Sequence, residues 1–220
     1  MNEHPILEPM GAFFDRRADG YEEHQMTAVD GGRELYPFTA SLLPVTPGAK
    51  ILDLGCGTGL ELDAYFPLNP TASVTGFDLS EKLTAELMRK HGDRDVTVKL
   101  ASYFDEPFGT AAYDAAVSVM SLHHFTMAQK IPLYRKLKDA LKPGGVFVLS
   151  DYLAPDEEFG AFRFSELERL KKLAGIGSGE SCHFDTPLTF VHETEALLEG
   201  GFSSVEKLAQ WGNTVTLLAK

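Results

Sequence analysis

Short apolar segments alternate with amphipathic segments through the middle of the chain. The segment 113–121 is almost continuously apolar, as expected for a strand that is covered on both faces. The amphipathic segments have the apolar spacing of helices that pack on a sheet. This alternation predicts a mostly parallel sheet with right-handed crossovers, in a doubly wound, Rossmann-like α/β fold. The expected strands are 49–55, 72–80, 96–102, 113–121 and 146–153.

Proline, glycine and hydroxyl residues indicate the ends of the helices. A serine or threonine can cap the first turn, and a Glu or Gln three residues later completes a capping box. Proline or glycine after an amphipathic segment predicts the end of a helix. These signals are Pro67 after the helix 58–66, Ser80 before the helix 81–92, Thr126 with Gln129 before a helix reaching Leu141, and Ser165 with Glu168 before a helix that ends at Gly175.

The 220 residues are expected to form a single domain with four parts. Residues 1–45 form a helical, aromatic N-terminal cap, and residues 46–155 form the ligand-binding core. Residues 156–190 form a helical and loop insertion over the site. Residues 191–220 form a helix and a terminal hairpin around "WGN". The hairpin adds antiparallel strands to the sheet edge, which predicts seven strands in all.

Charge and composition restrict the classes of molecule that this chain is expected to bind. The net charge is −12, and no Lys/Arg-rich run occurs, so a nucleic acid is disfavoured and a small molecule is favoured. No apolar segment is long enough to cross a bilayer, and the start lacks the pattern of a secretory signal. Cys56 and Cys182 lie far apart in no metal-ligand spacing, which favours a reduced, cytoplasmic protein. We expect a monomer or a homodimer.

The stretch "ILDLGCGTGLELD" carries the most specific signal. Gly55, Gly57 and Gly59 lie in the turn after the first strand, where glycines let the backbone approach a ligand closely. A nucleoside-triphosphate loop would need a GxxxxGK[ST] pattern, and a dinucleotide loop would need glycine in place of Leu60. Asp78, 19 residues after Gly59 at the end of the second strand, can accept hydrogen bonds from both ribose hydroxyls.

Four stretches together resemble the class I S-adenosylmethionine-dependent methyltransferase family, in its order and at its spacing. They are "ILDLGCGTG", "GFDLS", "YDAAVSVMSLHHF" and "LKPGGVFVLSDY", and the similarity covers residues 45–155. The resemblance implies a transferase that binds S-adenosyl-L-methionine and releases S-adenosyl-L-homocysteine. It also implies a set of cofactor-binding residues. These are Asp53, Gly55, Cys56, Gly57 and Gly59 for the methionine part, Asp78 for the ribose, Leu79, Ser102 and Tyr103 for the adenine, and Ser118 and Met120 beside the methionine end.

Ser102 departs from the family pattern, which places an acid there for the adenine amino group. Its hydroxyl can still accept one hydrogen bond, so we expect weaker adenine selection rather than lost binding.

Methyl transfer from a sulfonium is an in-line displacement that mainly requires alignment in a site closed to water. A general base is needed only if the acceptor must lose a proton before attack. Candidate catalytic residues are Tyr21, His123 and His183. For the double histidine, His123 and His124, a structural role is favoured over that of a base. No metal site is expected, because no HExxH or Cys/His spacing occurs and adjacent histidines on an extended chain point in opposite directions.

Two sequence features of related enzymes are missing from this chain, and their absence restricts the class of methyl acceptor. The Asn/Asp-Pro-Pro-Tyr element of relatives that methylate exocyclic amines of nucleic-acid bases is replaced by "VMSL", and no cysteine is placed to act as a nucleophile on a pyrimidine. A small-molecule acceptor is therefore favoured, with His183 and Asp185 in a loop over it. The aromatic residues that can line its pocket are Phe13, Phe14, Tyr21, Phe162 and Phe164.

Three alternatives to a small-molecule methyltransferase remain. The first is a cofactor-binding protein without methyl transfer, acting as a sensor or partner subunit. The second is an enzyme that carboxylates the sulfonium, which would need a cation such as Arg16, Arg17 or Arg33 near the methyl group. The third is a methyltransferase that acts on tRNA or protein.

Overall fold

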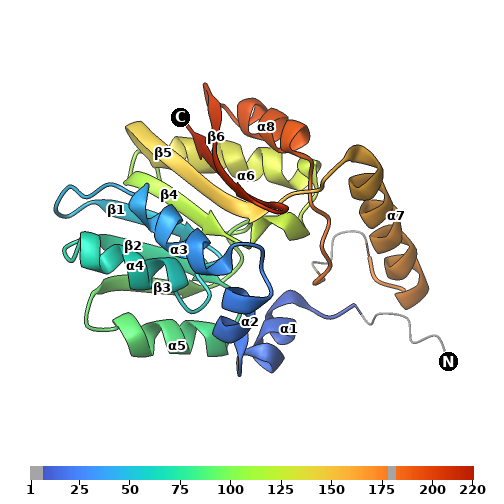
Figure 1. The fold of residues 1–220 in the computed structure, drawn as a ribbon, viewed down its shortest axis with the longest axis horizontal. Helices are drawn as coiled ribbons and strands as arrows, with labels where there is room; N and C mark the ends of the chain where they lie inside the picture. Colours follow the sequence, from blue (N-terminus) through green and yellow to red (C-terminus); the bar gives the residue numbers. More distant parts are fainter. Residues whose placement is uncertain (1–6, 178–181) are drawn as a thin grey trace.

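The computed structural model describes residues 7–177 and 182–220, and a sheet of seven strands forms the centre of this part (Figure 1). The strand order is β3-β2-β1-β4-β5-β7-β6. The first five strands are parallel, and β7 pairs antiparallel with both β5 and β6. The predicted fold class is therefore confirmed. The strands are β1 (Lys50–Leu54), β2 (Ser73–Asp78), β3 (Asp95–Leu100), β4 (Tyr113–Val119), β5 (Leu141–Tyr152), β6 (Val205–Trp211) and β7 (Thr214–Ala219).

Helices cover both faces of the sheet and extend beyond its carboxyl edge (Figure 1). Buried side chains of α3, α4 and α5 join one apolar cluster, and those of α6 and α8 join the other. The helices are α1 (Met10–Arg17), α2 (Tyr21–Thr27), α3 (Gly32–Ser41), α4 (Leu60–Leu68), α5 (Glu81–His91), the short 3-10 helix η1 (Leu122–His124), α6 (Met127–Ala140), α7 (Glu157–Ala174) and α8 (Phe190–Glu199).

Three of the predicted helix ends are confirmed by their capping geometry. The Ser80 hydroxyl accepts a hydrogen bond from Leu83 N at 3.2 Å, at the start of α5. Thr126 and Gln129 form the reciprocal capping box of α6. Gly175 ends α7 in the left-handed conformation, at φ 67°. Local sequence signals are sufficient at these positions because each cap is completed within one turn of helix.

Two predicted helix ends are wrong. Pro67 lies inside α4, which continues to Leu68, because a proline in the last turn removes only one hydrogen bond of the helix. Ser165 does not begin a helix, because α7 starts eight residues earlier, after Asp156, whose carboxylate accepts a hydrogen bond from Phe159 N at 2.8 Å. The Ser165 hydroxyl instead donates to the Phe162 carbonyl oxygen within α7.

The first helix is fixed beside the second strand by one close contact and one carboxylate. A Cβ atom at Gly11 would lie 2.5 Å from the Leu79 carbonyl oxygen, so only glycine permits this approach. Asp15 accepts hydrogen bonds from the Ser80 hydroxyl at 2.6 Å and from Lys82 N at 3.1 Å. As a result, α1 lies next to α5 at the carboxyl edge of the sheet (Figure 1).

Residues 1–6 of the predicted N-terminal cap and residues 178–181 of the predicted insertion lie outside the described residues. In the part that is described, no helix combines the length and apolar character needed to cross a membrane.

Candidate active site

The glycine turn after β1 is held in a conformation that side chains rarely adopt. Gly55 has φ 79°, and a Cβ atom there would lie 2.1 Å from the Ser121 hydroxyl. The Gly55 amide donates a hydrogen bond to the Phe77 carbonyl oxygen at 2.8 Å, which ties the turn to β2. Gly57 has φ 46° and lies next to the Tyr21 hydroxyl. The turn therefore packs directly against α2 and the segment after β4, and at Gly55 there is no room for a side chain.

Asp78 connects the glycine turn to the start of α5. One carboxylate oxygen accepts a hydrogen bond from Gly57 N at 2.9 Å, and the other accepts one from Ser80 N at 2.8 Å. Burial raises the pKa of Asp78, and these backbone donors partly offset the shift. Each oxygen keeps a further lone pair, so the carboxylate can still accept two hydrogen bonds from a ligand.

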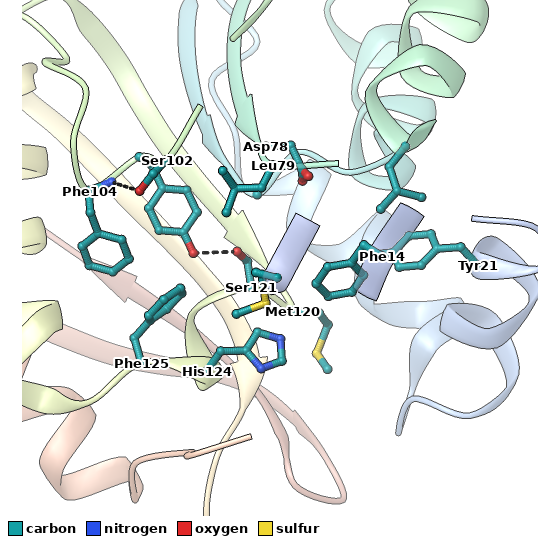
Figure 2. A pocket seen from close by; sticks show the side chains of 14 residues that line it. Phe14, Tyr21, Asp78, Leu79, Ser102, Phe104, Met120, Ser121, His124 and Phe125 are labelled. Atoms are coloured by element: carbon teal, nitrogen blue, oxygen red, sulfur yellow. Dashed lines mark hydrogen bonds between the residues drawn. The ribbon is translucent and has the colours of Figure 1, made fainter. Parts of the chain in front are cut away.

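A cavity opens over this carboxylate, and we call it the glycine-turn cavity (Figure 2). Six of the residues predicted to bind the cofactor line it: Gly55, Asp78, Leu79, Ser102, Tyr103 and Met120. Eight further residues complete the wall: Met10, Phe14, Tyr21, Leu83, Phe104, Ser121, His124 and Phe125. The wall is therefore mostly apolar and aromatic, with Asp78 as its carboxylate.

The third-strand position is occupied by a hydroxyl that already has a partner. Ser102 Oγ accepts a hydrogen bond from Phe104 N at 3.2 Å, and the Tyr103 hydroxyl is 3.0 Å from Ser121 Oγ (Figure 2). A serine oxygen can accept a second hydrogen bond. The absence of an acid at this position thus leaves one weak polar group on the adenine side of the predicted site.

The other predicted cofactor residues lie beneath the cavity wall. Ser118 is fully buried and donates a hydrogen bond to the Leu54 carbonyl oxygen at 2.8 Å. The Cys56 sulfur packs 2.7 Å from the position that a Cβ atom of Gly76 would take. Asp53 is 1% exposed, so its carboxylate also lies below the surface. Gly57 and Gly59 shape the turn but are not among the residues that line the cavity.

Asp53 and Glu61 form a buried acidic pair under the glycine turn. Among the described residues, the Glu61 carboxyl group is the one hydrogen-bond partner of the Asp53 carboxyl group. Burial raises the pKa of Asp53 well above its usual value, and the nearby Glu61 raises it further. Burial also raises the pKa of Glu61, to about 7. A ligand that carries a positive charge would oppose these shifts, because it stabilises the ionised form of both carboxyl groups.

Replacing Glu61 by glutamine is expected to flatten the pH dependence of stability in the cofactor-free protein. The folded-state pKa of Glu61, about 7, exceeds its ordinary value of 4.5, so its protonation stabilises the fold below pH 4.5. That stabilisation is lost as the pH rises from 4.5 to 7, at a cost of about 3 kcal/mol. Urea unfolding at several pH values should show a smaller loss in Glu61→Gln. The exposed control Glu195→Gln should follow the wild type, and parallel profiles for all three proteins would contradict this assignment.

A second cavity, of about 580 Å³, lies beside the first, and we call it the histidine cavity. Phe14, Tyr21, Met120 and His124 line both cavities and form a common wall. Met120 has φ 52°, a strained conformation for a residue with a side chain, as is common at functional sites. The rest of the histidine cavity is lined by Phe13, Arg16, Arg17, Asp19, Gly20, His24, Gln25, Val29, His123, Tyr152, His183 and Asp185.

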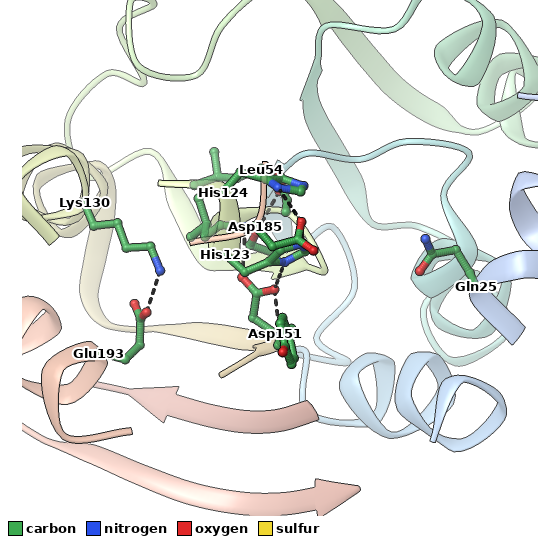
Figure 3. Close-up of polar contacts among 12 residues, drawn as sticks. Gln25, Leu54, His123, His124, Lys130, Asp151, Asp185 and Glu193 are labelled. Carbon is green, nitrogen blue, oxygen red and sulfur yellow. Dashed lines mark hydrogen bonds and ion pairs between the residues drawn. The ribbon is translucent and has the colours of Figure 1, made fainter. Parts of the chain in front are cut away.

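All three candidate catalytic residues line the histidine cavity, in different environments. Burial raises the pKa of Tyr21, and Asp78 raises it further, so the phenol stays protonated and acts as a donor. The His183 ring stacks on Phe13 at 3.3 Å, and burial lowers its pKa to about 3, which keeps it uncharged at neutral pH. His123 Nδ1 is 2.5 Å from the Asp151 carboxylate (Figure 3).

Asp151 is the partner that sequence reasoning missed. Burial alone would raise its pKa, but His123 lowers it below the usual value, so Asp151 is a carboxylate and His123 Nδ1 is the donor. Burial opposes a charge on His123, but Asp151 outweighs this and raises the His123 pKa. The sequence "LSDYL" around Asp151 does not reveal this pairing, because the two residues are 28 positions apart and lie in different elements, η1 and β5.

Two expectations about side-chain direction are wrong. His123 and His124 do not point in opposite directions, because they lie in η1 rather than on an extended chain, and their ring centroids are 4.0 Å apart. Phe162 and Phe164 do not line the histidine cavity, because they lie on exposed parts of α7 and are 61% and 44% exposed. Phe13, Phe14 and Tyr21, from α1 and α2, do line it.

The chain is similar to known methyltransferases in sequence and in fold. Residues 51–145 match the family model described as "Methyltransferase domain". The carboxy-S-adenosyl-L-methionine synthase of Campylobacter fetus is 26% identical, over 80% of this chain and 78% of its own. The 27-O-demethylrifamycin SV methyltransferase of Amycolatopsis mediterranei is also 26% identical, over 87% of this chain and 68% of its own.

Among solved structures, the DhpI complex with SAH (S-adenosylhomocysteine) has a TM-score of 0.69 and 18% identity, and the alignment covers 96% of this chain and 94% of DhpI. That likeness concerns the fold. The family match, the curated relatives and the shared fold agree with one another. Together they support a class I S-adenosyl-L-methionine-dependent methyltransferase, with S-adenosyl-L-methionine as its cofactor.

Proposed function

We propose that this chain transfers the methyl group of S-adenosyl-L-methionine to a small molecule bound in the histidine cavity. One observation carries the proposal: the glycine-turn cavity and the histidine cavity share a wall made by Phe14, Tyr21, Met120 and His124. A second concave cavity of about 580 Å³ beside the cofactor suits a small molecule better than a macromolecule. The relative that acts on demethylrifamycin supports this acceptor class, although a tRNA methyltransferase is also among the relatives.

In this proposal the residues under and around the glycine turn hold the cofactor. Asp78 accepts hydrogen bonds from the ribose hydroxyls with its two remaining lone pairs. Leu79 and Tyr103 pack against the adenine, and the acidic pair of Asp53 and Glu61 offsets the positive charge of the cofactor. The cofactor supplies an activated methyl group. What the protein must add is alignment and exclusion of water, and α1 and α2, as the N-terminal cap, provide both.

The acceptor would lie against aromatic and imidazole rings. Phe13 and His183 form a flat stacked pair in the histidine cavity, and Tyr21 offers a protonated hydroxyl as a donor. A planar or largely apolar acceptor fits such a wall. A cytoplasmic location and a monomeric or homodimeric state stay predictions from the sequence.

Replacing Phe13 by alanine is expected to raise KM for the acceptor by about tenfold and to leave cofactor affinity unchanged, because Phe13 lines only the histidine cavity. Steady-state kinetics and calorimetry with the cofactor measure the two effects separately. Phe162→Ala is the matched control, since that ring is 61% exposed on α7 and should change neither quantity. Equal weakening of cofactor binding by Phe13→Ala would argue against two separate cavities.

The proposal itself is tested by incubating the protein with methyl-labelled cofactor and a panel of phenols, carboxylic acids and amines. Mass spectrometry should find a labelled methyl group on one acceptor, with one S-adenosylhomocysteine formed for each. Binding of the cofactor without turnover of any panel member, together with methylation of tRNA or protein, would overturn the small-molecule assignment.

A second candidate activity is carboxylation of the cofactor. Arg16 and Arg17 line the histidine cavity, where they could receive an anionic co-substrate, and a carboxy-S-adenosyl-L-methionine synthase is among the relatives. Both arginines lie beside Glu8, however, and Arg17 also covers the Phe13 ring at 3.7 Å. Arg33, the third predicted cation, is not among the residues that line this cavity. The same mass spectra distinguish the activities, because this one leaves a heavier cofactor and no methylated acceptor.

A further inference from the structure

We propose that His123, His124 and Asp185 form a binding site for one divalent transition-metal ion in the wall of the histidine cavity. Each residue offers one ligand atom, and the three atoms lie within 4.8 Å of one another. Two of the residues come from η1, and the third comes from the loop before α8 (Figure 3). Two imidazoles and one carboxylate on one side of a metal ion leave its other positions open, here toward the cavity.

The ligand atoms lie as far apart as atoms that bind one metal ion. Asp185 Oδ1 is 3.2 Å from His124 Nδ1 and 3.6 Å from His123 Nε2. Zinc lies about 2.0–2.2 Å from nitrogen and oxygen ligands, so three atoms at this separation can surround one ion with small adjustments. The Nδ1 atom of His124 is buried and makes no hydrogen bond of good geometry with the described residues. Its nearest polar neighbour is the Asp185 carboxylate, and a metal ion bound to both groups would satisfy them.

The surrounding hydrogen bonds orient the ligands as in established metal sites. His123 donates its Nδ1 hydrogen to Asp151 at 2.5 Å, so Nε2, which lies 3.6 Å from Asp185 Oδ1, is the ring nitrogen that can bind a metal. Asp151 is fixed by hydrogen bonds from Leu122 N at 2.8 Å and Tyr152 N at 2.9 Å. Such a carboxylate–histidine pair fixes the tautomer and makes the imidazole a better ligand.

The loop that carries Asp185 is also held in place. Arg163 on α7 donates a hydrogen bond to the Asp185 carbonyl oxygen at 3.0 Å, and its guanidinium lies 3.8 Å from the second carboxylate oxygen. Thr186 N donates to the His123 carbonyl oxygen at 2.8 Å, which joins the loop to η1. The nearby His183 ring stacks on Phe13 and lies outside the group of three ligand atoms.

The ligand set selects the metal class. Imidazole nitrogens suit zinc, cobalt, iron and nickel, whereas magnesium and calcium prefer oxygen ligands alone. Asp151 and Asp185 together provide two negative charges to balance a dication. An acceptor with a phenolic, hydroxyl or carboxylate oxygen could then complete the coordination in the histidine cavity. This last step rests on the proposed methyl transfer, but the metal site does not.

The test titrates chelator-treated protein with Co²⁺, whose visible absorption reports nitrogen and oxygen ligands, and then with Zn²⁺ in competition. We expect one Co²⁺ per chain, displaced by Zn²⁺. Asp185→Asn and His124→Ala should abolish saturable binding. His24→Ala is the matched control, because His24 lines the same cavity outside the group and should bind Co²⁺ as the wild type does.

Asp151→Asn tests the role of Asp151 in orienting His123. We expect it to weaken Co²⁺ binding by about 10- to 100-fold and to keep one Co²⁺ per chain, unlike the loss of a ligand. Circular dichroism and thermal unfolding check that each variant is folded. Absence of saturable Co²⁺ and Zn²⁺ binding in wild type, or equal binding in wild type and Asp185→Asn, would overturn the site. Failure of the methyl-transfer proposal would show instead as lost cofactor binding or turnover, with metal binding intact.

Discussion

Asp78→Ala is expected to weaken binding of S-adenosyl-L-methionine by about two to three orders of magnitude. In the proposed site, two ribose hydroxyls donate to the Asp78 carboxylate, and each hydrogen bond to a charged group contributes about 1.5–3 kcal/mol. The substitution also frees the amides of Gly57 and Ser80, which this carboxylate now fixes. The glycine turn would lose its link to α5. Isothermal titration with the cofactor measures the change directly.

Asp114→Ala is the matched control for this experiment. Asp114 also accepts a hydrogen bond from a backbone amide, Lys50 N at 2.8 Å, but it lies at the amino end of β4, away from both cavities. Its loss should leave cofactor affinity within a factor of about two, because no ligand contact is removed. Similar affinities for Asp78→Ala and Asp114→Ala would show that the ribose binds elsewhere.

Lys130→Met is expected to lower the free energy of unfolding by about 3–5 kcal/mol. The Lys130 ammonium and the Glu193 carboxylate are 1% and 0% exposed, and they lie 2.5 Å apart between α6 and α8 (Figure 3). The Tyr134 hydroxyl also donates to Glu193. Removing the lysine leaves a carboxylate in an apolar core without its counter-charge, and that desolvation cost is large.

A double variant separates the missing charge from simple loss of packing. Lys130→Met combined with Glu193→Leu removes both charges and should recover most of the stability lost in Lys130→Met. Lys142→Met is the control, since its ion pair with Asp114 is 40% and 33% exposed and should contribute less than about 1 kcal/mol. Urea unfolding measures all three. An equal loss in Lys130→Met and Lys142→Met would refute the buried-charge explanation.

The sheet could be predicted from sequence because its signals are local. A buried parallel strand is a short apolar segment, a cap is completed within one turn, and the glycine turn carries its own spacing. Asp78 was found for the same reason, since it follows a strand at a fixed distance from the turn. A helix end was predicted wrongly where the same residues fit two positions in a helix. Ser165 can cap a helix, but it lies inside α7.

The candidate site is less predictable because it joins distant segments. The common wall of the two cavities combines Phe14 and Tyr21 from the N-terminal helices with Met120 and His124 from the segment after β4. His124 and Asp185 meet across 61 residues, through a loop without periodic sequence. Whether an aromatic residue lines a cavity or faces solvent depends on how its helix packs, and Phe14 and Phe162 show both outcomes.

The central claim is that the cofactor lies in the glycine-turn cavity and presents its reactive end to the histidine cavity. A crystal structure of the protein with S-adenosylhomocysteine tests it most directly. We predict that both ribose hydroxyls lie within hydrogen-bond distance of Asp78, and that the sulfur lies beside Met120, on the wall that the two cavities share. A sulfur directed away from the histidine cavity, or a ribose that does not contact Asp78, would contradict the account.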